Sequence, residues 1–243
     1  MKEGYIPKDQ RKKILLITDD IRMHSGVGSV GRELVLHTAH HFNWVNLGGA
    51  INHPDKGKRF DLSQETDKQM GLEDSSVFVY PIEGYSNAEF LRNIINMEQP
   101  DAIFLITDPR YFVWLFEIEN EIRARIPIVY LNIWDDLPAP LYNRPYYESC
   151  DALLAISKQT KNINELVLGE GVKNKIIEYV THGINTDVFF PVDKEDQEYQ
   201  EFIKKITKGR EYDFVMFFNS RNIRRKQIQD ALLSFKLFLD TLP

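Results

Sequence analysis

Seven short apolar runs, separated by segments long enough for helices, most constrain how this chain can fold. Each run is continuous rather than alternating with polar residues, which is typical of strands buried on both faces of a parallel sheet. Alternating strands and helices predict an α/β fold with a doubly wound parallel sheet. The runs are Lys13–Thr18, Asn43–Leu47, Val77–Tyr80, Asp101–Ile106, Ile126–Ile133, Ala152–Ile156 and Lys175–Val180.

Helix signals fall between these runs. Ser86 followed by Glu89 predicts a capping box ahead of an apolar stripe. Ser157 predicts the cap of another helix, which ends at Gly169. The polar stretch from residue 48 to residue 76 has no regular pattern, and we expect it to be a mobile surface loop.

A second α/β unit begins after a charged segment. Residues 194–211 are expected to form a linker or a surface helix between a first domain, residues 1–193, and a second, residues 212–243. The second would open with a strand over Tyr212–Phe218 and an amphipathic helix, and stop there. We expect such a truncated unit to pack onto the first domain, pair with another copy of the chain, or stay disordered.

Composition narrows the function classes. The 243 residues carry a formal charge of −6, which gives no overall attraction to nucleic acid or to an anionic membrane. The single cysteine, Cys150, excludes an internal disulfide framework and a four-cysteine zinc site. The first apolar run is too short for a signal peptide, which needs roughly 7–15 apolar residues. We therefore expect a cytoplasmic protein.

The stretch MHSGVGSVGREL, Met23–Leu34, spaces three glycines as G-x-G-x-x-G. In a dinucleotide fold the first glycine directly follows the strand, and an acidic residue ends the second strand. Here seven residues separate Thr18 from Gly26, and the second apolar run leads into Gly48. A nicotinamide or flavin site is therefore disfavoured. Two interpretations remain: glycines that allow close helix packing, or amides that face a substrate phosphate at a helix start.

A basic turn follows the last predicted strand. The sequence SRNIRRK places Arg221 and Lys226 five residues apart, between that strand and the helix after it. Open α/β sheets bind ligands at the carboxyl ends of their strands. Two cations there would suit a diphosphate, although a solvated charge run is the simpler interpretation of the turn alone.

Three motifs together resemble a known family. ISKQT at Ile156–Thr160, THGINTDVFFP at Thr181–Pro191 and the strand with SRNIRRK look, in order and spacing, like retaining GT-B glycosyltransferases of family 4, the glycogen-synthase-like branch. The resemblance covers nearly the whole chain. It implies an acceptor-binding first domain facing a second domain that binds a nucleotide-diphosphate sugar, with no metal or other cofactor required.

The resemblance also suggests roles for residues. Gly26 and Gly28 would approach the donor phosphates, and Arg221 and Lys226 would grip the departing diphosphate. His182 would lie where the chain enters the crossing between the domains. The family's pair of glutamates, spaced eight apart later in the second domain, has no counterpart in these 243 residues.

A second departure concerns the acceptor side. Many members carry a histidine after the strand that here reads IVYLNIWDD, where this chain has Trp134, Asp135 and Asp136. The stretch Trp134–Tyr147 is rich in aromatic rings and carboxylates, which suits sugar binding, while a packed proline-rich loop is the alternative. We take Trp134, Asp135, Asp136 and His182 as candidate acceptor-binding residues and Asp135 as the candidate catalytic residue.

A metal site has weaker support in the sequence than a sugar-binding site. The stretch His37–His41 puts two histidines on one helical face, but a third ligand and the H-E-x-x-H pattern are missing, so we expect a packed amphipathic helix and no metal.

The sequence therefore favours a retaining glycosyltransferase, present as an incomplete and inactive fragment. A non-enzymatic nucleotide- or acceptor-binding module is the alternative, and an oxidoreductase comes third.

Overall fold

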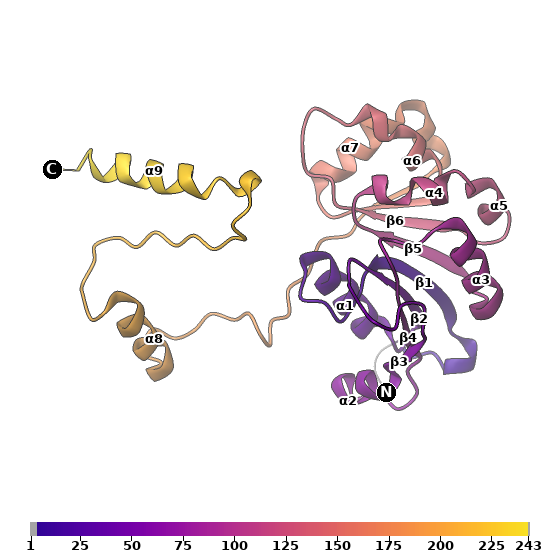
Figure 1. The fold of residues 1–243 in the computed structure, drawn as a ribbon, viewed down its shortest axis with the longest axis horizontal. Coiled ribbons are helices and arrows are strands. Elements are labelled where there is room, and N and C mark those ends of the chain that lie inside the picture. Colours follow the sequence, from indigo (N-terminus) through magenta and orange to yellow (C-terminus); the bar gives the residue numbers. More distant parts are fainter. Residues whose placement is uncertain (1–3, 243) are drawn as a thin grey trace. The chain divides into compact units, whose positions relative to one another are not determined.

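A computed structural model describes residues 4–242 and confirms the predicted α/β fold. The chain divides into two compact units, one reaching Gly183 and the other starting at Ile184. The first unit is built around one eight-stranded sheet with helices on both faces (Figure 1). Its strands are β1 Lys12–Asp19, β2 Phe42–Gly49, β3 Phe60–Asp61, β4 Val77–Pro81, β5 Ala102–Ile106, β6 Ile128–Asn132, β7 Ala152–Ala155 and β8 Ile176–Tyr179.

The sheet order is β3-β4-β2-β1-β5-β6-β7-β8, and every pairing except that of β3 with β4 is parallel. All seven predicted strands of this unit are present. The chain winds outward from β1 in one direction to β2 and β4, and in the other direction from β5 to β8. Neighbouring β1 and β5 therefore flank the point where the strand order reverses, which is where doubly wound folds place their ligand crevice.

Helices cover both faces of the sheet because the strands are apolar on both sides. One buried cluster joins the sheet to α3, α4, α5 and α7, and the other joins it to α1 and the start of α2. The helices of this unit are α1 Gly26–Thr38, α2 Ser63–Met70, α3 Ala88–Glu98, α4 Val113–Phe116, α5 Glu119–Arg123, α6 Arg144–Glu148 and α7 Lys158–Leu168, with short 3-10 turns η1 Lys8–Gln10, η2 Pro109–Phe112, η3 Leu141–Asn143 and η4 Gly169–Asn174.

Two local predictions need correction. The stretch expected to be a loop contains β3 and α2, because β3 gains pairing from β4 and α2 buries Thr66 against the sheet. The cap of α3 is Asn87 rather than Ser86, since the Asn87 side chain accepts a hydrogen bond from the Phe90 amide. Ser157 caps α7 as predicted, and Gly169 ends that helix.

The histidine stretch also differs from the prediction. Helix α1 ends at Thr38, so His40 and His41 lie beyond it rather than on one helical face. His37 instead pairs with Glu33, 3.2 Å away.

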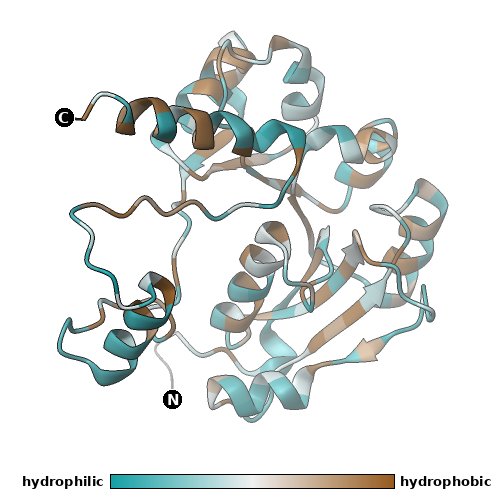
Figure 2. Ribbon diagram, turned by 60° about the vertical axis from the view of Figure 1, so that its left-hand side comes forward, coloured by the Kyte–Doolittle hydropathy of each residue, from teal (hydrophilic) through white to brown (hydrophobic). Residues whose placement is uncertain are grey.

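The second unit contains α8 Gln197–Thr207, the 3-10 turn η5 Arg224–Lys226 and α9 Ile228–Leu239. The strand predicted over Tyr212–Phe218 is wrong: this segment has no strand assignment. A strand needs a hydrogen-bonded neighbour, and no strand of the described chain pairs with this segment. Its side chains are exposed, Phe217 by 84%. Figure 2 shows the alternating apolar and polar residues of α9.

Within residues 4–242, no helix combines the length and apolar character needed to cross a membrane.

Candidate functional site

The loops that follow the parallel strands meet along one edge of the sheet, and three groups of predicted site residues lie there. Gly26 follows β1, Trp134–Asp136 follow β6, and His182 follows β8. Adjacent strands are about 4.8 Å apart. The loop after β6 is therefore about 10 Å from the loop after β1, with β5 between them.

The glycine stretch opens helix α1 rather than forming a loop of its own. Ser25 caps the helix, and its Oγ accepts a 2.9 Å hydrogen bond from the Gly28 amide. A Cβ on Gly28 would lie 2.9 Å from the carbonyl oxygen of Met23, so this glycine is required for packing. A Cβ on Gly26 would meet open space. Only Gly26 therefore presents backbone that a ligand could approach, while the Gly28 amide is already bonded.

Asp19, at the end of β1, anchors the loops around the switch point. The residue is 6% exposed. Its Oδ1 accepts a 2.6 Å hydrogen bond from the Tyr85 hydroxyl, and its Oδ2 accepts one from Ser25 Oγ. The Tyr85 ring in turn lies against Tyr111, with 4.7 Å between centroids. The Asp19 carboxylate thus ties the β1 loop to the β4 loop, and the Tyr85 ring extends the contact to the β5 loop.

Burial, followed by the hydrogen bond to Asp19, raises the pKa of Tyr85 well above its ordinary value. The hydroxyl therefore keeps its proton and acts as a donor at neutral pH.

The residue after β5 adopts a rare backbone conformation. Thr107 has a φ of +121°, which costs on the order of 1–3 kcal/mol for a residue with a side chain. Its carbonyl accepts a 2.9 Å hydrogen bond from the buried Tyr130 hydroxyl, which helps to hold the turn. Such strain is concentrated at ligand sites and switches.

Just beyond Thr107, an ion pair faces solvent. The guanidinium of Arg110 donates a fork of hydrogen bonds to Asp108. These bonds, opposed by partial burial, lower the pKa of Asp108. The pair adds a fixed carboxylate and a fixed cation to the edge.

The loop after β6 carries the aromatic and acidic residues that the sequence singled out. The Trp134 ring meets Tyr142 edge-on, with 6.0 Å between centroids. The Trp134 indole N–H donates to the carbonyl of Asp136 at 3.0 Å. Asp135 and Asp136 are exposed, and Asp136 Oδ1 accepts the Leu137 amide at 2.8 Å. Asp135 makes no side-chain hydrogen bond within the described residues.

A buried polar network supports this loop from below. The Asn132 amide donates to the Tyr147 hydroxyl at 2.9 Å and to Asn164 Oδ1 at 2.5 Å. Its Oδ1 accepts the Trp134 amide at 3.0 Å. The position of Trp134 is therefore set by side chains of β6, α6 and α7.

The remaining three candidates are exposed, one at the edge and two in the second unit. His182 is exposed shortly after β8. Arg221 and Lys226 belong to the second unit and are exposed, with Lys226 ending the turn η5 just before α9.

Several residues of the edge were missed from the sequence. The polar Asp19 directly at the end of an apolar run was a visible signal. The contributions of Tyr85, Thr107 and Arg110 depended on strand order and backbone conformation, which the sequence does not display. Among the residues described, no group of three or more acidic, histidine or cysteine side chains could hold a metal ion.

Comparisons with known proteins give structural likeness only. No protein-family model matches the sequence, and no curated protein matches it either. The structure of UGT71G1 from Medicago truncatula complexed with UDP-glucose is similar with a TM-score of 0.48 and 14% identity, covering 94% of this chain and 64% of that one.

The structure of α,α-trehalose 6-phosphate synthase from Burkholderia multivorans is similar with a TM-score of 0.40 and 10% identity, covering 73% of this chain and 50% of that one. The chain therefore spans less than two thirds of either protein.

Proposed function

We propose that this protein takes part in glycosyl transfer, moving a sugar from a nucleotide-diphosphate donor to an acceptor hydroxyl with the anomeric configuration kept. The three motifs that resemble family 4 suggest the class of reaction. The observation that carries the proposal is the carboxyl edge of the sheet, where Asp19 and Tyr85 fix the start of α1 beside the β1/β5 switch point. That is where doubly wound folds bind phosphorylated ligands.

Each part of the edge has a proposed task. The exposed first turn of α1 at Gly26 offers backbone N–H groups and the positive end of the helix dipole to a phosphate. Trp134 would stack against an acceptor sugar, while Asp135, Asp136 and His182 would bind its hydroxyl groups. Asp135 is proposed as the catalytic residue because its exposed carboxylate has no side-chain partner within the described residues.

The chemical demand is charge stabilisation while the sugar–phosphate bond breaks. Arg221 and Lys226 would neutralise the departing diphosphate, an effect in which one preorganised donor or charge contributes about 10²–10³ in rate. With these cations in place the step needs no metal, and no other cofactor is proposed. The partners of the protein would be the nucleotide sugar and a hydroxyl-bearing acceptor, in the cytoplasm.

A transfer assay tests the proposal. The full-length protein that contains these 243 residues is incubated with a panel of nucleotide-diphosphate sugars and sugar acceptors, and release of the nucleoside diphosphate is followed. Release that depends on the acceptor, with a product whose anomeric configuration matches the donor by NMR, supports the proposal. A product of inverted configuration would contradict the proposed retention of configuration but would still support glycosyl transfer. Donor or acceptor binding without turnover would instead favour the non-enzymatic binding module.

A further inference from the structure

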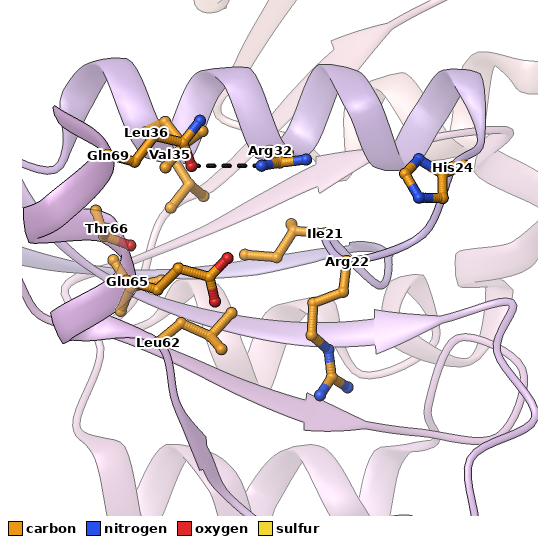
Figure 3. A pocket seen from close by; sticks show the side chains of 11 residues that line it. Ile21, Arg22, His24, Arg32, Val35, Leu36, Leu62, Glu65, Thr66 and Gln69 are labelled. Atoms are coloured by element: carbon orange, nitrogen blue, oxygen red, sulfur yellow. Dashed lines mark hydrogen bonds between the residues drawn. The ribbon is translucent and has the colours of Figure 1, made fainter.

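A small cavity lies between α1, α2 and the sheet and reaches the β1–α1 loop (Figure 3). Its volume is about 170 Å³. Pockets for drug-sized ligands are about 300–1,000 Å³, so this one suits a smaller molecule. The floor is apolar, formed by Ile21, Leu62 and Val77 among others. Charged and polar side chains from the helices and from the β1–α1 loop surround its mouth.

Two opposite charges line this cavity without pairing. The Glu65 carboxylate extends from α2 into the cavity, and Arg32 lies across it on α1 (Figure 3). Among the residues that the structure describes, Arg32 donates only to the uncharged Gln69, at 3.3 Å. Within residues 4–242 the Glu65 carboxylate makes no hydrogen bond or ion pair. A site between two helices thus holds an anion and a cation that are both open to a ligand.

Within the described chain, neither of the other two basic side chains that line the cavity pairs with Glu65. Arg22 turns its guanidinium toward Asp20 and donates to it at 2.8 and 2.6 Å. His24 stands at the far end of α1 from Gln69 in Figure 3 and adds a second nitrogen-bearing group on the side of Arg32. The position of Glu65 in the first turn of α2 favours that helix through its dipole, but the dipole does not require the carboxylate to enter the cavity.

We propose that this cavity binds a small zwitterion with an apolar side chain, of the α-amino acid class. The ligand's ammonium group would pair with Glu65, its carboxylate would pair with Arg32, and its side chain would cover the apolar floor. A ligand of this kind satisfies both open charges at once, which neither an anion nor a cation alone can do. The side chains that bind this ligand differ from those of the glycosyl transfer proposed above, although the cavity adjoins the same β1–α1 loop.

The test uses the 243-residue chain and L-leucine as the probe, followed by calorimetry and by NMR of the methyl groups of Leu62 and Val77. Three relatives of leucine each lack one feature: 4-methylpentanoate has no ammonium, 3-methylbutylamine has no carboxylate, and glycine has no apolar side chain. We expect leucine to shift both methyl signals and to bind at least tenfold more tightly than each of the three.

Matched variants identify the groups involved. Glu65→Gln and Arg32→Gln should each weaken leucine binding at least tenfold. Glu89→Gln removes a similar exposed carboxylate from the first turn of α3, and Arg125→Gln removes an exposed arginine elsewhere, so both should leave the affinity unchanged.

The proposal is overturned if 10 mM leucine leaves both methyl signals in place, if the amine alone binds equally well, or if a crystal structure shows Arg32 and Glu65 closed into a direct ion pair. Circular dichroism of each variant confirms that the fold is retained, and a variant that has lost it is replaced by Glu65→Ala or Arg32→Lys in the same comparison.

Discussion

The Tyr85 hydroxyl donates a 2.6 Å hydrogen bond to the Asp19 carboxylate, joining the loop after β4 to the end of β1. Asp19 is nearly buried, and Ser25, the cap of α1, donates to its other oxygen. The carboxylate therefore depends on two hydroxyl groups for its solvation. Because Ser25 also accepts from the Gly28 amide, the orientation of the first turn of α1 is coupled to this contact.

Replacing Tyr85 by phenylalanine should destabilise the fold. Hydrogen bonds to charged groups contribute about 1.5–3 kcal/mol, and the loss leaves one Asp19 oxygen without a donor. We expect the free energy of unfolding at pH 7 to fall by about that amount, measured by urea denaturation. Tyr111→Phe is the matched control, since the Tyr111 ring lies against Tyr85 but the residue is 55% exposed. Equal losses in the two variants would contradict a specific role for the hydroxyl.

Two tyrosines should make the protein sensitive to alkaline pH. Burial, followed by hydrogen bonding to Glu98, raises the pKa of Tyr80 to about 12, and burial together with Asp19 raises the pKa of Tyr85 further. The folded state holds both protons more tightly than the unfolded state, whose tyrosine pKa is about 10. Their contribution is thus complete below pH of about 10 and is lost as the pH rises through the folded-state values.

Urea denaturation between pH 8 and pH 11 measures this loss. The decline in stability above pH 10 should be shallower in Tyr80→Phe and in Tyr85→Phe than in the unmodified chain, while Tyr142→Phe, an exposed tyrosine, should decline as the unmodified chain does. Parallel curves for all four proteins would be evidence against the assignment.

The two glycines at the start of α1 should respond differently to alanine. A Cβ at position 28 would crowd the carbonyl oxygens of Met23 and Asp20 and the Ser25 hydroxyl. Overpacking of this kind costs about 1–3 kcal/mol, so Gly28→Ala should lower the unfolding free energy by that amount. Gly26→Ala meets no neighbour and should change it by less than about 0.5 kcal/mol.

Ligand binding separates the two positions further. If the proposed phosphate site is correct, Gly26→Ala should weaken donor binding while leaving the melting temperature unchanged. Normal affinity in Gly26→Ala, with a destabilised Gly28→Ala, would leave close packing as the full explanation of the glycine motif.

The sheet could be predicted from sequence because each parallel strand is apolar on both faces, so its run of residues is visible without any partner. The run Tyr212–Phe218 has the same local signal, yet it forms no strand, because pairing depends on a neighbour that the run itself does not encode. The two-residue strand β3 was missed for the opposite reason: it has no apolar run of its own, and only its pairing with β4 defines it.

The sequence predicted the part of the candidate site that lies directly after an apolar run, but not the contacts between distant residues. Trp134 to Asp136 were found because they follow a strand directly. The link between Asp19 and Tyr85 joins residues 66 positions apart, and it exists because β1 and β4 end at the same edge of the sheet. The rare φ of Thr107 has no compositional signal, because threonine is not a residue that favours it.

The basic turn provides a test of the donor side. If Arg221 and Lys226 hold the leaving diphosphate, then Arg221→Gln or Lys226→Gln in the full-length protein should lower turnover by about 10²–10³ and weaken binding of the nucleoside diphosphate. Arg125→Gln, an exposed arginine in the first unit, serves as the control. Normal turnover in the Arg221→Gln, Lys226→Gln double variant would exclude the clamp.

The 243-residue chain by itself should bind nucleotide sugars weakly and transfer no sugar. The apolar residues Phe214 to Phe218 are between 40% and 84% exposed, and the side chains of α9 include none that is buried. Burial of one large apolar side chain contributes roughly 1.5–3 kcal/mol, so the second unit lacks the packing that would hold Arg221 and Lys226 in fixed positions. A charge that is not preorganised stabilises a transition state far less. Calorimetric titration with a panel of nucleotide sugars, run beside the transfer assay, measures both properties. Micromolar donor affinity together with measurable transfer would show that the second unit is sufficient as it stands and would contradict this prediction.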